Sequence, residues 1–254
     1  MSISAPLHSL VGVSAGVWRA HALAAPLARV VATGDAALDA QLPGGGWPVG
    51  ALTEVLQAPG VHGEWRLLLS ALARCGSAAV VLVGAPHTPF GPALAAHGLA
   101  PQRLLWVTSA QPAQRLWVTE QALRCAGVDA VLAWLPQARS DQLRRLQMVA
   151  GEFSRLLFVM RADSAQQESS PAVLRLLLQP QDEAPSDAGC AHSDGLQVHF
   201  LKRRGPPLEQ PVCLAAWSPP QVVLEAAARC GQAGAVPAAF AEGGNALDRT
   251  AERA

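Results

Sequence analysis

"VVATGDAALDAQLPGGGWPVGALTEVL" (residues 30–56) places small, apolar and acidic residues in a fixed order before an apolar run. A glycine-rich turn alone would say little about the fold, but an ordered series across the whole segment is informative. The closing residues, "ALTEVL" (51–56), predict a strand, which a Pro/Gly-rich loop and then a helical pattern follow. The positions that form the series are Thr33, Gly34, Leu38, Asp39, Leu42, Gly44 to Gly46, Pro48, Gly50 and Glu54.

The loop after this strand has the layout of a phosphate-binding loop without its chemistry. Such a loop reads G-x-x-x-x-G-K-[ST]: its amides cradle the phosphates, its lysine reaches the outer oxygens and its hydroxyl holds magnesium. Residues 58–65 read "APGVHGEW", so Ala58 replaces the first glycine, Gly63 keeps the second, and Glu64 and Trp65 replace lysine and hydroxyl. A carboxylate repels phosphate, and an indole offers a metal no oxygen.

The magnesium site lacks its second ligand as well. An acidic residue usually ends a neighbouring buried strand, but "VDAVLAWLP" (128–136) carries Trp134 there. We therefore expect no nucleotide cofactor, no metal and no ATP hydrolysis. The alternative is a strand-to-helix turn that never bound phosphate, and the flanking sequence has to decide between the two.

Beyond residue 51, β-rich runs alternate with helical patterns, which predicts an α/β fold with a mostly parallel sheet flanked by helices. After Pro171, three strand patterns without an intervening helix (172–180, 195–204 and 211–217) predict an antiparallel extension. Ser140 is the expected N-cap of its helix. The other predicted strands cover 78–86, 103–108, 128–136 and 155–160, and the predicted helices cover 64–76, 92–99, 113–127 and 139–153.

Composition narrows the class of protein. The 254 residues carry 19 basic and 19 acidic side chains, a net charge of zero, and this balance argues against a broad electrostatic grip on nucleic acid. The five cysteines form no CxxC or Cys/His cluster, so neither a zinc site nor a disulfide framework is indicated. No basic residue precedes Arg19 and no apolar run has the length of a membrane span, so we expect a cytoplasmic protein without a membrane partner.

The series in residues 30–56 resembles the segment that enters the core of RecA-type recombinases. "LRCAGVDAVLAWLP" (123–136) resembles the RecA stretch ending in the magnesium-linked strand, with the acid replaced, and "HFLKRRGPP" (199–207) resembles the late basic strand and turn. A RecA-like core with "PGGGWP" (43–48) and a degenerate nucleotide site is similar to the ImuA family, in which a Trp-Arg helix such as "VWRAHAL" (17–23) precedes the core.

The resemblance implies a non-catalytic accessory protein of SOS-induced, error-prone translesion DNA synthesis. Its implied partners are an ImuB-like Y-family protein, an error-prone polymerase III alpha-type subunit and RecA itself. Two alternatives stay open: a cell-division inhibitor of the related SulA kind, and a residual RecA-type ATPase or recombination mediator. The implied domains are an N-terminal helical segment (1–29), a RecA-like core (30–217), and a C-terminal helix with a flexible tail (218–254).

Candidate contacts with DNA or a partner are few. The loops "PQARSDQ" (136–142) and "RADSAQQESS" (161–170) stand where RecA holds single strands, but they lack the basic and aromatic mixture that stacks on bases. Direct DNA binding is therefore expected to be weak. Lys202, Arg203 and Arg204 form the densest basic cluster, which is either a solvated strand end or a contact with DNA or an acidic partner.

Other conspicuous side chains also have two interpretations. Trp18, Trp47 and Trp65 lie in loops or near helix starts, where an indole is either core or an exposed binding residue. His62 and His87 follow strand ends, but no Ser, Cys or carboxylate stands at motif spacing beside them, so they do not indicate catalysis.

Overall fold

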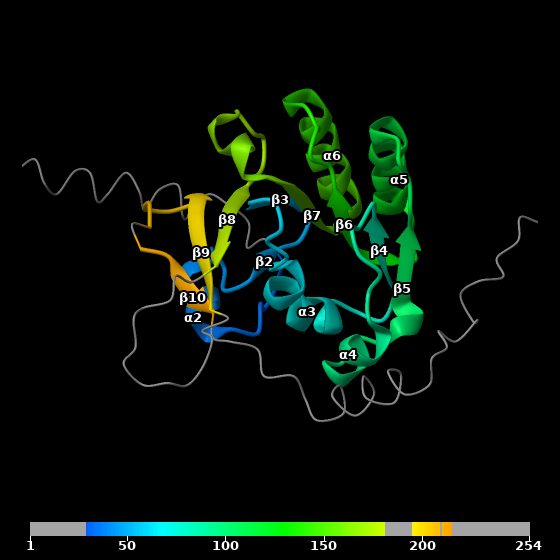
Figure 1. The fold of residues 1–254 in the computed structure, drawn as a ribbon, viewed down its shortest axis with the longest axis horizontal. Coiled ribbons are helices and arrows are strands. Elements are labelled where there is room, and N and C mark those ends of the chain that lie inside the picture. The colour runs from blue at the N-terminus through cyan, green and yellow to red at the C-terminus, as the bar shows by residue number, and fades with distance from the viewer. Residues whose placement is uncertain (1–28, 181–194, 209, 215–254) are drawn as a thin grey trace, which may run out of the picture. The chain divides into compact units, whose positions relative to one another are not determined.

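The computed structural model describes residues 29–180, 195–208 and 210–214. An eight-stranded sheet in the order β10-β9-β8-β3-β7-β6-β4-β5 forms the centre of this part (Figure 1). Its strands are β3 (Ala51–Gln57), β4 (Ala79–Val83), β5 (Leu104–Val107), β6 (Val128–Trp134), β7 (Leu156–Ala162), β8 (Leu174–Pro180), β9 (Leu196–Lys202) and β10 (Val212–Leu214). This is the predicted α/β, RecA-like core with a mostly parallel sheet.

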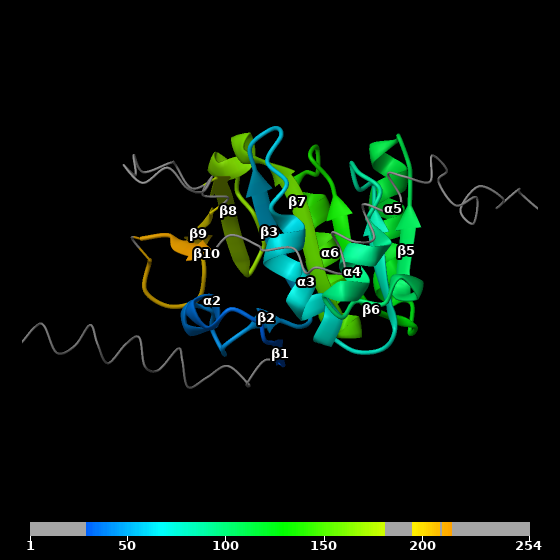
Figure 2. The same ribbon diagram turned by 60° about the horizontal axis from the view of Figure 1, so that its bottom comes forward.

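Helices cover both faces of the sheet (Figures 1 and 2). One face carries α5 (Pro112–Arg124) and α6 (Ser140–Phe153), and the other carries α3 (Glu64–Arg74) and α4 (Gly91–Ala96). Two short 3-10 helices, η2 (Pro101–Arg103) and η3 (Asp163–Gln167), complete the connections. Because both faces are covered, the central strands are apolar at successive positions, as the continuous runs predicted.

The strands β4, β6 and β7 therefore each contribute to two separate cores. Leu82, Leu132 and Phe158 pack on the α3 side, whereas Val83 and Val131 pack on the α5/α6 side. The alternation follows from the pleat, which sends successive side chains to opposite faces.

The last three strands form the predicted antiparallel extension. β8 pairs antiparallel with β9, and β9 pairs antiparallel with β10. On its other side β8 pairs in parallel with β3, so it joins the extension to the parallel part of the sheet. The predicted N-cap differs: α6 begins at Ser140, and Arg139 is its cap, with its N–H donating to Gln142 Oε1 at 2.9 Å.

The ordered series of residues 30–56 has a structural explanation in this chain. A small sheet of β1 (Val30–Val31) and β2 (Trp47–Pro48) and the helix α2 (Ala36–Gln41) form there. The Thr33 N–H donates to Asp39 Oδ1 at 2.8 Å, and Asp35 caps α2 by accepting from the Leu38 N–H at 2.9 Å. These acids thus satisfy backbone groups at a helix start, and no catalytic role is needed to explain them.

Trp47 is a core residue, which decides between its two interpretations. It is fully buried, and its ring meets Phe158 edge-on with the ring centroids 5.4 Å apart. Trp65 is half-buried against the α3-side core. Trp18, the N-terminal segment and the C-terminal helix and tail lie outside the described residues, so the predictions for them stay predictions.

The two helices α5 and α6 are joined by a partly buried ionic cluster. Glu120 of α5 accepts from Arg145 of α6 at 2.6 Å and from Arg124 at 3.1 Å. Burial raises the pKa of Glu120, but the two arginine hydrogen bonds outweigh it, and the pKa lies below its ordinary value of 4.5.

This lowered pKa predicts an acid-dependent loss of stability. Glu120 takes up its proton at a higher pH in the unfolded chain than in the folded chain. The contribution of its ion pairs to the free energy of unfolding is therefore present above about pH 4.5 and is lost as pH falls through the folded pKa. Glu120→Gln is expected to lower the free energy of unfolding at pH 7, and its difference from the unsubstituted protein should shrink below pH 4.5. Urea unfolding between pH 3 and pH 7 measures this. Glu152→Gln, an exposed acid on α6, is the control and should leave the pH profile unchanged.

Within the ranges that the structure describes, no helix has both the length and the apolar character needed to cross a bilayer.

Candidate functional site

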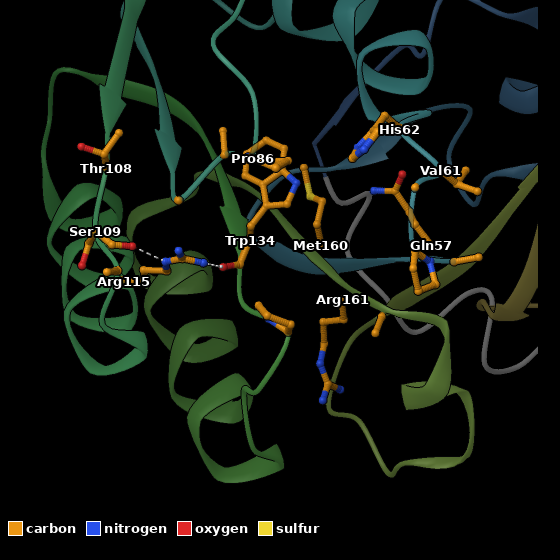
Figure 3. A pocket seen from close by; sticks show the side chains of 18 residues that line it. Gln57, Val61, His62, Pro86, Thr108, Ser109, Arg115, Trp134, Met160 and Arg161 are labelled. Atoms are coloured by element: carbon orange, nitrogen blue, oxygen red, sulfur yellow. Dashed lines mark hydrogen bonds between the residues drawn. The ribbon is translucent and has the colours of Figure 1, made fainter.

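A cavity of about 680 Å³ opens at the carboxyl ends of the parallel strands (Figure 3). Ligands of open α/β sheets bind in the crevice at this edge. The lining comes from the ends of β3, β4, β5, β6 and β7 and the loops after them: Gln57, Ala58, Pro59, Gly60, Val61, His62, Gly84, Ala85, Pro86, Thr108, Ser109, Ala110, Arg115, Trp134, Pro136, Met160, Arg161 and Ala162.

Of the predicted phosphate-loop positions, some line the cavity and others are buried in the protein. Ala58 lines the cavity, whereas Gly63 is buried at the N-cap of α3. Glu64 is only 2% exposed, and neither it nor Trp65 lines the cavity. The sequence predicted that these two side chains fill the space of a phosphate and its metal, but in the structure they lie outside the cavity lining. Other groups must therefore exclude a nucleotide.

The first of these groups is Gln57, at the end of β3. Its Oε1 accepts from the Gly63 N–H at 3.1 Å, and both residues are buried. The Gly63 amide is the one remaining glycine amide of the loop pattern, and a side-chain oxygen of the same chain now takes the place of a phosphate oxygen. An added anion would have to break this bond to use the amide.

The second feature is the charge of the cavity lining. Its side chains contain neither lysine nor carboxylate. Trp134 stands at the end of β6, where the sequence predicted that the magnesium-linked acid was replaced, and its side chain lies beside Pro86 and Met160 (Figure 3). The lining side chains therefore offer no acidic oxygen to magnesium, whose preferred ligands are oxygens.

The arginines of the lining are already engaged within the protein. Arg115 donates through Nε to the Ser109 carbonyl at 2.6 Å and through Nη1 to the Trp134 carbonyl at 3.4 Å (Figure 3). Its side chain lies against Gly84, where a Cβ would stand 2.7 Å from Nε. Arg161 points away from the cavity and donates to Glu54 and Glu168.

The cavity brings two histidines together at its rim. His62 Nε2 and His87 Nε2 are 3.1 Å apart, although the residues come from the loops after β3 and β4. The Ser109 hydroxyl of the lining bonds to Gln114 Oε1 at 2.9 Å. Within the described residues, no hydrogen bond joins a hydroxyl of the lining to a histidine or a carboxylate.

Two residues of the basic cluster, Lys202 and Arg203, donate hydrogen bonds to backbone carbonyls of the protein. Lys202 donates to the Ser170 carbonyl at 3.0 Å, and Arg203 donates to the carbonyls of Gln41 and Pro206. Arg204 is exposed. These contacts favour the interpretation of the cluster as a strand end, where Lys202 and Arg203 bond to neighbouring segments of the chain.

The second loop expected to match a DNA-binding loop of RecA (161–170) accepts hydrogen bonds from an arginine through its backbone carbonyls. Arg175 on β8 donates to the carbonyls of Ala165, Gln166 and Glu168. Residues 163–167 form η3 under this arginine. Sequence reasoning missed this role, although an arginine within the apolar run "VLRLLLQ" (173–179) was a signal that a partner for it had to exist.

Comparisons of the chain with protein-family models and with curated proteins found no match.

Proposed function

We propose that this protein is a non-enzymatic accessory factor of SOS-induced, error-prone translesion DNA synthesis. It acts in the cytoplasm by binding an ImuB-like Y-family protein, an error-prone polymerase III alpha-type subunit and RecA. The observation that carries the proposal is a RecA-like sheet whose ligand edge has lost the groups for MgATP. The Gly63 amide is bonded to Gln57, and the lining side chains include neither a lysine nor an acid.

Protein contact is the function that such a core still supports. A RecA-type switch needs a nucleotide that both binds and is hydrolysed, and the side chains of the cavity lining include neither a lysine for the phosphates nor a carboxylate for magnesium. The loop that would hold single-stranded DNA is bonded to Arg175, and the basic cluster is bonded to nearby carbonyls. DNA contact is therefore weak or indirect in this proposal.

A surface for a protein partner lies at the β5 edge of the sheet. β5 is the last strand of the order, so one side of it has no strand partner. Leu105 and Trp106 are 54% and 39% exposed on this strand, and Trp117 is 62% exposed on α5, the next element. Exposed apolar and aromatic side chains at an unpaired edge are typical of a surface that a partner strand or helix covers.

The double substitution Leu105→Glu and Trp106→Glu is expected to weaken the complex with the ImuB-like protein at least tenfold, because two acids would have to be desolvated in an apolar interface. Titration calorimetry of the purified pair measures the change. Met148→Glu on α6 is the matched control, since Met148 is 70% exposed outside this edge. Equal affinities for all three proteins would remove the β5 edge from the proposal.

The function itself is tested in cells. Deleting the protein should lower damage-induced mutagenesis, and a tagged copy should co-purify with the ImuB-like protein. Filamentation on overexpression, with mutagenesis unchanged on deletion, would instead identify a division inhibitor of the SulA kind.

A further inference from the structure

We propose that His62 and His87 form a transition-metal site at the rim of the cavity. The proposal rests on the geometry of the two side chains and does not depend on the function proposed above. Both residues are exposed, and they lie in loops that follow different strands, so no helix or strand periodicity brings them together.

The two rings present their Nε2 edges to each other. The Nε2 atoms are 3.1 Å apart, whereas the ring centroids are 4.5 Å apart, so the nitrogen edges are closer than the rings as a whole. The ring planes are nearly perpendicular, at 83°. This arrangement lets both Nε2 lone pairs point to one region of space without a clash between the rings.

The spacing fits coordination of one cation by both nitrogens. A metal–imidazole nitrogen bond is about 2.0–2.1 Å long, so two nitrogens 3.1 Å apart subtend an angle of about 100° at the metal. That angle lies between the right angle of a square-planar or octahedral site and the tetrahedral angle. Imidazole nitrogen suits Cu²⁺, Ni²⁺ and Zn²⁺, and two such ligands bind Cu²⁺ most tightly in the general order of affinities.

Proton placement is compatible with this role. Within the described residues, no hydrogen bond reaches Nδ1 of either ring, and both rings are exposed, so each Nδ1 can carry its proton into solvent. Both Nε2 atoms are then free to bind metal. A direct Nε2–H···Nε2 hydrogen bond is the competing state, and a metal replaces its proton.

The remaining coordination positions face the open rim. His62 lines the cavity, and no third histidine, cysteine or acid of the described residues joins the pair in a cluster that could hold a metal. A bound cation would therefore keep water molecules that a donor atom in the cavity can exchange. The site is thus an open two-histidine site, unlike a closed structural zinc site with four protein ligands.

The test uses the full chain without a purification tag and CuCl₂ or NiCl₂ as the probe. Titration calorimetry should show one Cu²⁺ per chain, and electron paramagnetic resonance should show two equivalent imidazole nitrogens on the copper. His62→Ala and His87→Ala should each weaken binding at least tenfold, and the double variant should lose the signal. His8→Ala and His192→Ala, at histidines away from the pair in the sequence, are controls and should bind as the unsubstituted chain does.

Both substituted side chains are exposed, so the variants should keep their urea unfolding midpoints, which checks that the fold is intact. Copper binding that survives in the double variant with unchanged affinity would overturn the proposal. So would an unsubstituted chain that binds Cu²⁺ and Ni²⁺ no better than the double variant.

Discussion

Glu54→Gln is expected to lower the free energy of unfolding by about 3–5 kcal/mol, the cost of leaving a buried charge without its partner. Glu54 lies in the middle strand β3 and is 0% exposed. Its Oε1 accepts from Arg161 of β7 at 3.2 Å, and its Oε2 accepts from Arg175 of β8 at 2.6 Å. One carboxylate thus pairs with two buried guanidinium groups on the two strands that flank it.

Glutamine keeps the shape of the side chain but removes the charge and turns one acceptor into a donor. The NH₂ group then faces a guanidinium that can only donate, so the buried hydrogen bond to that arginine is lost, and the remaining oxygen accepts from the other arginine without a charge. Equilibrium urea unfolding at pH 7 measures the effect. Glu168→Gln is the matched control, because Glu168 also bonds to Arg161, at 2.7 Å, but its side chain is 55% exposed. The control should cost about 1 kcal/mol or less.

If both substitutions cost the same small amount, Glu54 does not hold the three strands together. The assignment of this acid as a structural residue of the core would then be wrong, and its place in the ordered series of residues 30–56 would need another explanation.

Trp47→Ala is expected to cost about 3–5 kcal/mol, the range for removing a large buried aromatic side chain. Trp47 is fully buried on the α3 side of the sheet, where its ring contacts Phe158 of β7 edge-on. The substitution leaves a cavity beneath the small β1–β2 sheet and removes the aromatic contact. The segment of β1, α2 and β2 would consequently lose one of its buried contacts with the large sheet.

The same unfolding measurement tests this prediction, and Trp117→Ala provides the control. Trp117 is 62% exposed on α5, so its removal should change the free energy of unfolding by no more than about 0.5 kcal/mol. A Trp47 variant as stable as the Trp117 variant would show that the indole is not part of the core.

The sequence predicted the large elements because their signals are local. The strands 51–56, 128–136 and 155–160 are short runs rich in apolar residues, and the helices between them have a three-to-four-residue periodicity. The parallel pairing of β8 with β3 was not predicted, because the apolar run around Leu176 looks the same in a parallel and an antiparallel strand.

The site was predicted only in outline. The lack of a lysine after Gly63 and of an acid at the end of β6 can be read from Glu64 and Trp134 in the sequence, but the structure places Glu64 and Trp65 outside the cavity lining. The contact between Gln57 and the Gly63 amide, and the burial of Glu64, depend on how α3 packs on the sheet. The His62–His87 pair likewise joins loops separated by 25 positions, and no spacing rule connects them.

The central claim is that this RecA-like core has no working nucleotide site. Equilibrium dialysis of the full chain against labelled MgATP at concentrations up to millimolar tests it most directly, with Arg115→Ala as a variant of the cavity lining. The account predicts no saturable binding to either protein. Saturable binding of one MgATP per chain that Arg115→Ala weakens would contradict it.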